Sequence, residues 1–368
     1  MSLNKASNSI FVSSCRADWG LINLVTMVRP FDLRDLALLR RTGERGVSLH
    51  AVSALVENFH PLRSAIVSML IGGEFPTFVW KPDNGENAGF IQLRIPASAT
   101  QAYVLYISPR CQPPADGAAA MSIPAIDEAA LDEPGCSAWL ALLDEAAAGL
   151  GSRGVHHIIA EVDEHGVELQ ALRRAGFAIY TRQDIWTMRA ADYKPQALPN
   201  HPLTRRVSTD EWDVQLLYAN TVPRLVQAVE PLPINGEGEG WVLREGDELA
   251  AFVNVRRGAV ATWLRFFIHP EAESEAADIV AAALQVAFAN ESELVYCCVR
   301  RYESWSSNTL EHGGFHLVGS QAVMVRHIVQ HLPRSVPEAA VALEGQRISA
   351  SSPIVRNFRK ANHKNGSL

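Results

Sequence analysis

Hydrophobic positions along the chain change repeatedly between the alternation typical of strands and the spacing of three to four residues typical of helices. After a strand-like run over 24–30, Asp32 precedes apolar residues at helical spacing and is expected to cap a helix. A second helical pattern covers about 61–71. Three runs rich in β-branched and aromatic residues follow, separated by Pro, Asn and Gly, over 75–80, 89–95 and 102–107. This order predicts a strand, two helices and an antiparallel meander.

The next segment alternates between helix and strand. An Ala/Leu-rich helix is expected over 138–150 and a buried strand over 157–162. A helix over 168–174 should end at Gly176, because glycine commonly terminates helices, and a long strand over 177–188 should follow.

The second half repeats this ending at the same spacing, which indicates an internal duplication. A strand beginning at His156 leads to Gly176, and a strand beginning at Leu294 leads to Gly314, so both intervals are 20 residues (176 − 156 and 314 − 294). At this offset of 138 residues, Gln183 coincides with Gln321. Upstream of the repeated ending, strand-like runs over 241–244, 249–255 and 259–268 and a helix over about 274–288 repeat the meander and helix of the first half.

The expected division of the chain follows from this repeat and from the Pro-flanked stretch near position 195. We expect a flexible extension over 1–26, a first domain over 27–192, a linker over 193–202, a second domain over 203–330 and a basic tail over 331–368. For the tail we favour a mobile, solvated terminus over an arm that binds nucleic acid or a partner.

Composition narrows the function classes. With 48% hydrophobic and 20% charged residues the chain is expected to be globular, and a net charge of -7 makes nucleic acid an unlikely partner. Five cysteines without a C-x-x-C spacing favour a reducing, cytoplasmic location, and Cys297 and Cys298 should be buried on opposite faces of one strand. No apolar run approaches the ~18 residues of a membrane span, and no metal-binding motif occurs.

Four local motifs add specificity to the predicted order of elements. They are Val28-Arg29-Pro30 with Asp35, the strand end Tyr106-Ile107-Ser108-Pro109, the strand end Phe267-Ile268-His269-Pro270, and the two steps Gly176-Phe177 and Gly314-Phe315. Together they make the chain resemble the GNAT (Gcn5-related N-acetyltransferase) superfamily, over about 27–190 and again over 203–328.

The resemblance implies an α/β (α+β) fold with two tandem domains, each a mixed, mostly antiparallel sheet flanked by helices. It also implies transfer of an acyl group from acetyl-CoA or another acyl-CoA to an amine of a small molecule or a protein. In the family the pantetheine pairs with the fourth strand, which corresponds here to two sets of residues: Tyr106, Ile107 and Ser108 in the first domain, and Phe267, Ile268 and His269 in the second.

The chain departs from the family at two places. The family's pyrophosphate turn places Arg or Gln and two small residues where this chain has Glu273, Ala276 and Asp278, and carboxylates there should repel phosphate, although acids at a helix N-terminus also stabilise the helix. The family's Tyr that protonates the leaving thiolate corresponds to Leu172 and Leu310, which cannot donate a proton.

Four residues remain as candidates for the general base. Three are carboxylates near the ends of the fifth strands, namely Glu161, Asp163 and Glu303, and the fourth is His269, which ends a fourth strand; a solvated acid or a loop histidine is the alternative for each. We expect the second domain to be the catalytically active one, because its fourth strand runs directly into the next helix. A catalytically inactive tandem protein that binds or scaffolds remains the alternative function, and the oligomeric state is not predicted.

Overall fold

The computed structural model describes residues 27–71, 74–82, 88–96, 100–111, 134–195, 203–232, 238–289, 292–303 and 305–328. Contacts group the chain into one compact unit, Met1–Val329, and a second unit, Gln330–Leu368. The predicted N-terminal extension and basic tail lie outside the described residues, as does most of the predicted linker.

The first half follows the predicted order, with β2 and α2 added between the first two predicted helices. Its elements are β1 (Met27–Pro30), the 3₁₀ helix η1 (Leu33–Asp35), α1 (Leu36–Thr42), β2 (Val47–Ser48), α2 (Ala51–Leu55), α3 (Pro61–Ile71), β3 (Thr77–Lys81), β4 (Gly89–Arg94), β5 (Gln101–Ser108), α4 (Pro134–Gly151), β6 (His157–Asp163), α5 (Val167–Arg174) and β7 (Ala178–Arg189). Asp32 caps η1 as expected, since its side chain accepts a hydrogen bond from the Leu33 amide.

In its described residues, the second half repeats this order without a counterpart of β2 and with two α-helices in place of three before the meander. Its elements are β8 (Thr204–Arg205), η3 (Ser208–Asp210), α6 (Glu211–Thr221), α7 (Arg224–Gln227), β9 (Glu239–Glu245), β10 (Glu248–Arg257), β11 (Thr262–Ile268), η4 (Pro270–Glu275), α8 (Ala276–Phe288), β12 (Leu294–Arg300), α9 (Ser306–His312) and β13 (His316–His327). The predicted strand over 259–268 begins three residues later than expected, because residues 258–261 form the turn that follows β10.

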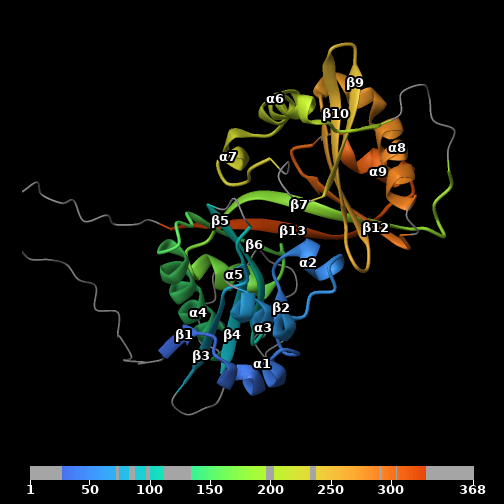
Figure 1. Cartoon of the computed structure of the whole chain (residues 1–368). Coiled ribbons are helices and arrows are strands. Elements are labelled where there is room, and N and C mark those ends of the chain that lie inside the picture. Colours follow the sequence, from blue (N-terminus) through green and yellow to red (C-terminus); the bar gives the residue numbers. More distant parts are fainter. Residues whose placement is uncertain are drawn as a thin grey trace, which may run out of the picture. The chain divides into compact units, whose positions relative to one another are not determined.

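All of these strands belong to one sheet with the order β1-β3-β4-β5-β6-β13-β7-β12-β11-β10-β9-β8, and β2 pairs with β5 outside this path. The last strands of the two halves are exchanged: β13 pairs with β6, and β7 pairs with β12. In Figure 1, β7 in green and β13 in orange-red run side by side between the two halves.

The exchanged strands meet at a local two-fold axis. Gln183 of β7 lies directly opposite Gln321 of β13, and the Gln183 Nε2 donates to the Gln321 Oε1 at 2.7 Å. These two residues are related by the offset of 138 that the sequence repeat shows (321 − 183). An antiparallel pair of equivalent residues places the axis between them, so the predicted duplication is confirmed.

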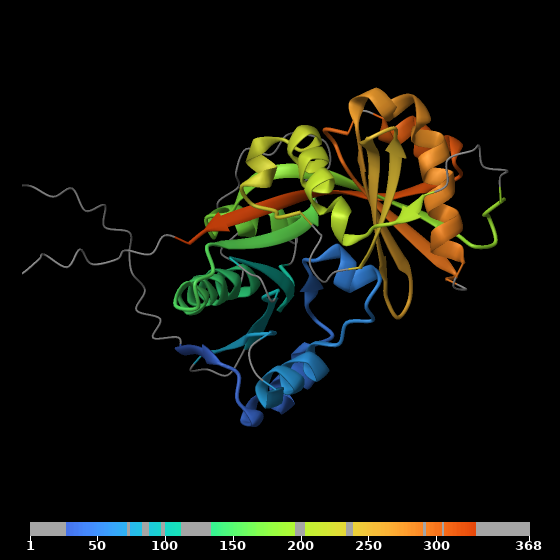
Figure 2. The ribbon, with the colours of Figure 1, turned by 45° about the horizontal axis from the view of Figure 1, so that its top comes forward.

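Helices cover both faces of each half of the sheet. In the second half, α8 and α9 pack on one face around Leu264, Phe266 and Val299, whereas α6 and α7 pack on the other around Phe252 and Phe267 (Figure 2). Side chains of successive residues in β12 point to opposite faces of the sheet. Cys297 and Cys298 therefore belong to different hydrophobic clusters, and both are buried, as predicted.

Both Gly-Phe steps end their helices in the same way. Gly176 and Gly314 adopt φ values of +81° and +88°, in the left-handed region that favours glycine. The amides of Phe177 and Phe315 donate to the Leu172 and Leu310 carbonyls, each at 3.0 Å. These hydrogen bonds are typical of helix C-termini that end in glycine, so the sequence signal at both sites marks a helix stop.

We expect Gly314→Ala to lower the free energy of unfolding by about 1–2 kcal/mol, because a Cβ is unfavourable in the left-handed region. Gly319→Ala is the matched control in β13: its φ lies outside that region and an added Cβ would meet no atom within 4 Å. Urea unfolding of the two variants measures the difference. Equal stability of both would contradict this account of the helix stop.

Candidate functional site

The parallel strand pairs of both halves separate before the strands end. β5 and β6 pair only from Gln101 with His157 to Tyr103 with Ile159. β11 and β12 pair from Thr262 with Val295 to Arg265 with Cys298. Beyond these positions the strands of each pair diverge, so each half has a V-shaped opening in its sheet.

The chain itself fills the first opening. Val47 and Ser48 of β2 pair with Ile107 and Tyr106 on the side of β5 that faces β6. The Leu49 amide donates to the Leu105 carbonyl at 3.1 Å, and the Glu161 amide of β6 donates to the Leu49 carbonyl at 2.8 Å. A ligand could pair with this edge of β5 only after residues 47–49 had left it.

The candidate residues around the first opening hold the segment that joins α1 to α2. The Tyr106 hydroxyl donates to the Gly43 carbonyl at 2.6 Å, and the Ser108 hydroxyl donates to the Thr42 carbonyl at 2.7 Å. Ile107 is fully buried, and a carboxylate oxygen of Glu161 accepts from the Ala51 amide at 2.6 Å. All four residues therefore have structural contacts here.

The second opening is not filled in this way. Phe267 pairs with Phe252 of β10, and the His269 amide donates to the Ala250 carbonyl at 2.8 Å. Because hydrogen-bonding direction alternates along a strand, the amides and carbonyls of Phe266 and Ile268 face the opening. Among the described strands, none pairs with this edge of β11 beyond Arg265.

A cavity of about 100 Å³, which we call the V cavity, lies at this opening. The end of α6, the end of β11 with the start of η4, and the connection from β12 to α9 form its walls. Its lining residues are Asn220, Thr221, Phe267, Ile268, Pro270, Glu273, Tyr302, Glu303 and Trp305.

Glu303 lines the V cavity and has a pKa close to neutral. Burial raises its pKa to about 7, although Arg265 and Arg300 act in the opposite direction. One of its carboxylate oxygens accepts from the Arg300 amide at 2.9 Å, which fixes the side chain. A carboxylate with a pKa near 7 can accept a proton at neutral pH and release it again.

Tyr302 was missed by the sequence reasoning and stands beside Glu303 in the same cavity. Its hydroxyl is buried and has no hydrogen-bond partner among the described residues. Burial raises its pKa above the usual value, so the phenol is neutral and can donate a proton. The predicted Tyr position holds Leu310, which is fully buried in the core, so the only sequence signal was a tyrosine in the loop after β12.

His269 and the acidic turn lie at the rim of the V cavity. His269 is the N-cap of η4, where its Nδ1 accepts from the Glu271 amide at 3.3 Å. Glu271 and Glu273 lie in the first turn of η4, and Asp278 lies in the first turn of α8. The turn therefore has Glu273 where the family has Arg or Gln and Asp278 where the family has a small residue, whereas Ala276 is small as in the family.

A second cavity of about 170 Å³, the shared cavity, is lined by residues of both halves. On its wall Glu230 accepts hydrogen bonds from Arg265, Arg300 and Tyr180. Burial alone would raise the pKa of Glu230, but Arg300 and Arg265 outweigh that effect and lower it to about 2. Glu161 also lines this cavity, so Glu161 and Glu303 lie in different cavities.

The two cavities adjoin along two strands. Arg265 lines the shared cavity and Phe267, two residues further along β11, lines the V cavity. Arg300, the last residue of β12, lines the shared cavity, and Tyr302, in the turn that follows, lines the V cavity. Residues i and i+2 of β11 lie on one face about 7 Å apart, and the Arg265 guanidinium lies over the Phe267 ring, 5.2 Å from its centroid.

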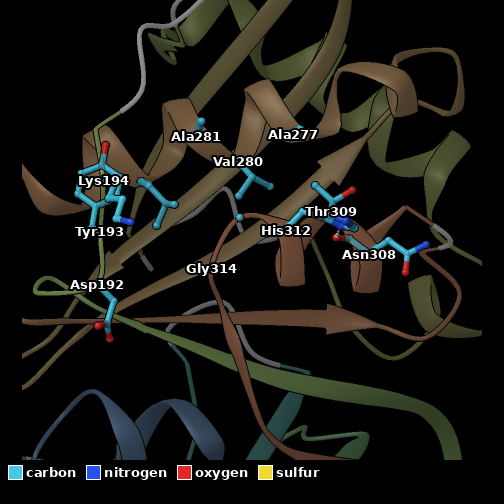
Figure 3. Close-up of a pocket in the computed structure, with 12 residues that line it drawn as sticks. Asp192, Tyr193, Lys194, Ala277, Val280, Ala281, Asn308, Thr309, His312 and Gly314 are labelled. Carbon is cyan, nitrogen blue, oxygen red and sulfur yellow. Dashed lines mark hydrogen bonds between the residues drawn. The ribbon is translucent and has the colours of Figure 1, made fainter.

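A third cavity, about 610 Å³, is a groove between α8 and α9 that includes residues 192–194. Figure 3 shows Tyr193 and Lys194 at one end and Asn308 at the other. Its α8 wall consists of small and alkyl residues, and polar side chains come from its two ends and from α9, namely Asp192, Tyr193, Lys194, Asn308, Thr309 and His312. Glu303 and Tyr302 do not line this groove.

In the described part of the chain, no group of three or more His, Cys, Asp or Glu residues could hold a metal ion. None of the helices there is both long enough and apolar enough to cross a membrane.

Comparison with known proteins gives structural matches only. No family model matches the chain, and no curated protein sequence does. A Gcn5-related N-acetyltransferase from Sphaerobacter thermophilus is similar with a TM-score of 0.51 at 11% identity, over 83% of this chain and 97% of that one. A tandem GNAT protein from the clavulanic acid biosynthesis pathway has a TM-score of 0.44 at 13% identity, over 83% and 99%. A Gcn5-related N-acetyltransferase from Kribbella flavida has 0.43 at 12% identity, over 66% and 88%. The match to the Sphaerobacter thermophilus protein shows that the chain has the fold of a Gcn5-related N-acetyltransferase, and the pairing of equivalent residues of β7 and β13 shows that the chain contains two repeats.

Proposed function

We propose that the protein is an acyl-CoA-dependent N-acyltransferase whose reaction centre is the V cavity of the second half. It transfers an acetyl or other acyl group to an amine of a small molecule or a protein. This proposal rests mainly on two neighbouring residues that line the V cavity at the unfilled opening of the sheet. Glu303 has a pKa of about 7, and the Tyr302 hydroxyl has no hydrogen-bond partner among the described residues.

The residues that would hold the acyl-CoA follow from the opening. The edge of β11 at Phe266 and Ile268 offers amides and carbonyls to the pantetheine, and Phe267, Ile268 and Trp305 supply apolar walls. The thioester supplies the activated acyl group. His269 contributes as the cap that orients the turn into α8.

Proton transfer is then divided between two neighbouring side chains. Glu303 accepts the proton that the amine nitrogen loses as it forms its bond to the thioester carbonyl carbon. Tyr302 donates a proton to the sulfur as the carbon–sulfur bond breaks, so the products are an amide and free CoA. Two groups with pKa values near and well above neutral suit these opposite roles.

The first half has a supporting role in this proposal. Because β2 fills its opening, we assign no cofactor to Tyr106, Ile107 and Ser108 and treat Glu161 as part of the shared cavity. The boundary between a supporting half over 27–192 and a catalytic half over 203–330 is part of the proposal. A cytoplasmic location is also part of it and agrees with Cys297 and Cys298, which are buried and form no disulfide.

The direct test is release of free thiol from acetyl-CoA in the presence of a panel of small amines and lysine peptides. We expect amine-dependent release by the wild-type protein and little by Tyr302→Phe, which keeps the ring and removes only the hydroxyl. Release that is equal in the two proteins would contradict the role of Tyr302, and no release with any amine would contradict the proposed activity.

The acidic turn favours a second candidate, an inactive tandem protein that binds or scaffolds. Glu271, Glu273 and Asp278 surround the place where the family seats a pyrophosphate, and like charges oppose binding there. If acyl-CoA does bind across this turn, the carboxylates should weaken its binding by a measurable factor.

We therefore expect Glu273→Arg to tighten acetyl-CoA binding about 3- to 10-fold at low salt, because it exchanges a repulsive charge for an attractive one near the phosphates. Glu311→Arg makes the same charge change at an exposed position at the end of α9 and is the matched control. Titration calorimetry at two salt concentrations measures both. Identical affinities for the two variants would place the phosphates elsewhere and strengthen the second candidate.

A further inference from the structure

The shared cavity is built by both halves and suits a small polar molecule. Its walls include Tyr103 and Glu161 of the first half and Asn254, Trp263 and Arg265 of the second. A volume of about 170 Å³ is several times that of one water molecule in the liquid, ~30 Å³. That size excludes a folded partner and admits a compound of about the size of an amino acid.

The floor of the shared cavity carries guanidinium groups that are incompletely paired. One carboxylate, Glu230, serves two guanidiniums, those of Arg265 and Arg300. Arg300 is only 3% exposed, and the Nε atoms of both arginines are buried without a hydrogen-bond partner among the described residues. Arg300 also donates to the Gln183 Oε1, whereas the Arg265 side chain is 17% exposed and is the more accessible guanidinium for a carboxylate in the cavity.

Two more charged side chains line the shared cavity: Glu161, which accepts a hydrogen bond from the Ala51 amide, and Arg256. The pKa of Glu230 is about 2, so Glu230 carries one negative charge at neutral pH, against the two positive charges of Arg265 and Arg300. Burial lowers the pKa of His50, and burial raises the pKa of Cys298 to about 12, so both are neutral. Glu57 is engaged with Arg256 at the rim.

We infer that the acceptor is a small amine that carries a carboxylate, and that its carboxylate binds at Arg265 and Arg300 in the shared cavity. This inference rests on the proposed function for the reaction of the amine, but the carboxylate site itself does not. Residues i and i+2 on β11 lie about 7 Å apart, and the hydrogen bond between a guanidinium and the acceptor's carboxylate spans about 3 Å of that distance. About 4 Å then remain between the carboxylate and the V cavity. An acceptor whose amine lies a few bonds from its carboxylate fits this distance.

Binding without acyl-CoA tests the site separately from catalysis. We expect glycine and β-alanine to raise the thermal unfolding midpoint, whereas glycinamide and β-alaninamide, which have nearly the same shape and lack the carboxylate, should bind at least 10-fold more weakly. Arg265→Met should weaken β-alanine binding by a similar factor. Arg326→Met removes a guanidinium that pairs with Asp144 in the first half and is the control.

The outcomes separate the two proposals. A carboxylate preference without acyl transfer supports the site and contradicts the proposed function. Acyl transfer at equal kcat/KM to β-alanine and β-alaninamide supports the function and overturns this inference, as does binding that Arg265→Met leaves unchanged. If Arg265→Met does not fold, Arg265→Lys keeps the charge but loses the planar fork, and it must still weaken β-alanine binding for the inference to stand.

Discussion

Glu303→Gln is expected to lower kcat by about 10²- to 10³-fold while acetyl-CoA binding changes less than about threefold. The glutamine amide has nearly the same shape as the carboxylate but cannot accept the proton of the amine. In the wild-type protein, kcat should rise with pH through about 7 as Glu303 ionises. This dependence should be absent from the residual activity of the variant, and its persistence there would assign the titration to another group.

The same substitution should stabilise the protein at alkaline pH. The pKa of Glu303 in the folded protein is about 7, above the ordinary value of 4.5, so its protonated form is the favoured one. The stability that this proton contributes is present below about pH 4.5 and is lost as pH rises through 7. Glu303→Gln cannot lose it, and we expect it to be about 1–3 kcal/mol more stable than the wild type at pH 8.

Urea unfolding at pH 5 and pH 8 measures this effect, with Glu311→Gln as an exposed control on the neighbouring helix. A gain in stability together with a loss of activity is the pattern expected of a residue kept for function. A variant that is less stable than the wild type at pH 8 would show that the ionised Glu303 carboxylate is structural.

Glu230→Gln is expected to destabilise the protein by about 3–5 kcal/mol, the largest effect on stability in this account. Glu230 is 5% exposed and lies between Arg265 and Arg300, so the substitution leaves two guanidiniums in a buried site without their counter-charge. The double variant Glu230→Gln/Arg300→Met removes one of those charges and should recover part of the loss.

The pH dependence of stability provides a second measurement of the same group. The folded pKa of Glu230, about 2, lies below the ordinary 4.5, so its contribution is present above pH 4.5 and lost as pH falls through 2. Wild-type stability should therefore fall over this range, and Glu230→Gln should lack that part of the fall. Equal acid sensitivity in both proteins would contradict the role given to Glu230.

The duplication was predictable because it leaves marks at fixed positions. Gly176 and Gly314 must adopt left-handed conformations, and Gln183 and Gln321 keep the same offset, so the repeat survives although few other residues coincide. The meanders were predictable from short apolar runs between turn residues. The exchange of β7 and β13 was not, because either strand could pair with the apolar edge of its own half.

The difference between the two openings could not be read from the sequence. β2 has two residues, too few for any periodicity, yet its pairing with β5 decides that the first opening is filled. Tyr302 was likewise not predicted, because it lies outside the family's tyrosine position, where the chain has Leu310. Glu303 was named from its place near a strand end, but its raised pKa depends on burial that only the folded chain shows.

The stoichiometry of acetyl-CoA binding to the full chain, measured by titration calorimetry, tests the difference between the two openings most directly. We predict one molecule per chain, bound at the second half, with the heat reduced by substitutions that fill the V cavity and unaffected by Ser48→Ala in β2. Two molecules per chain would show that β2 leaves the first opening, and no binding at millimolar concentration would contradict the acyltransferase itself.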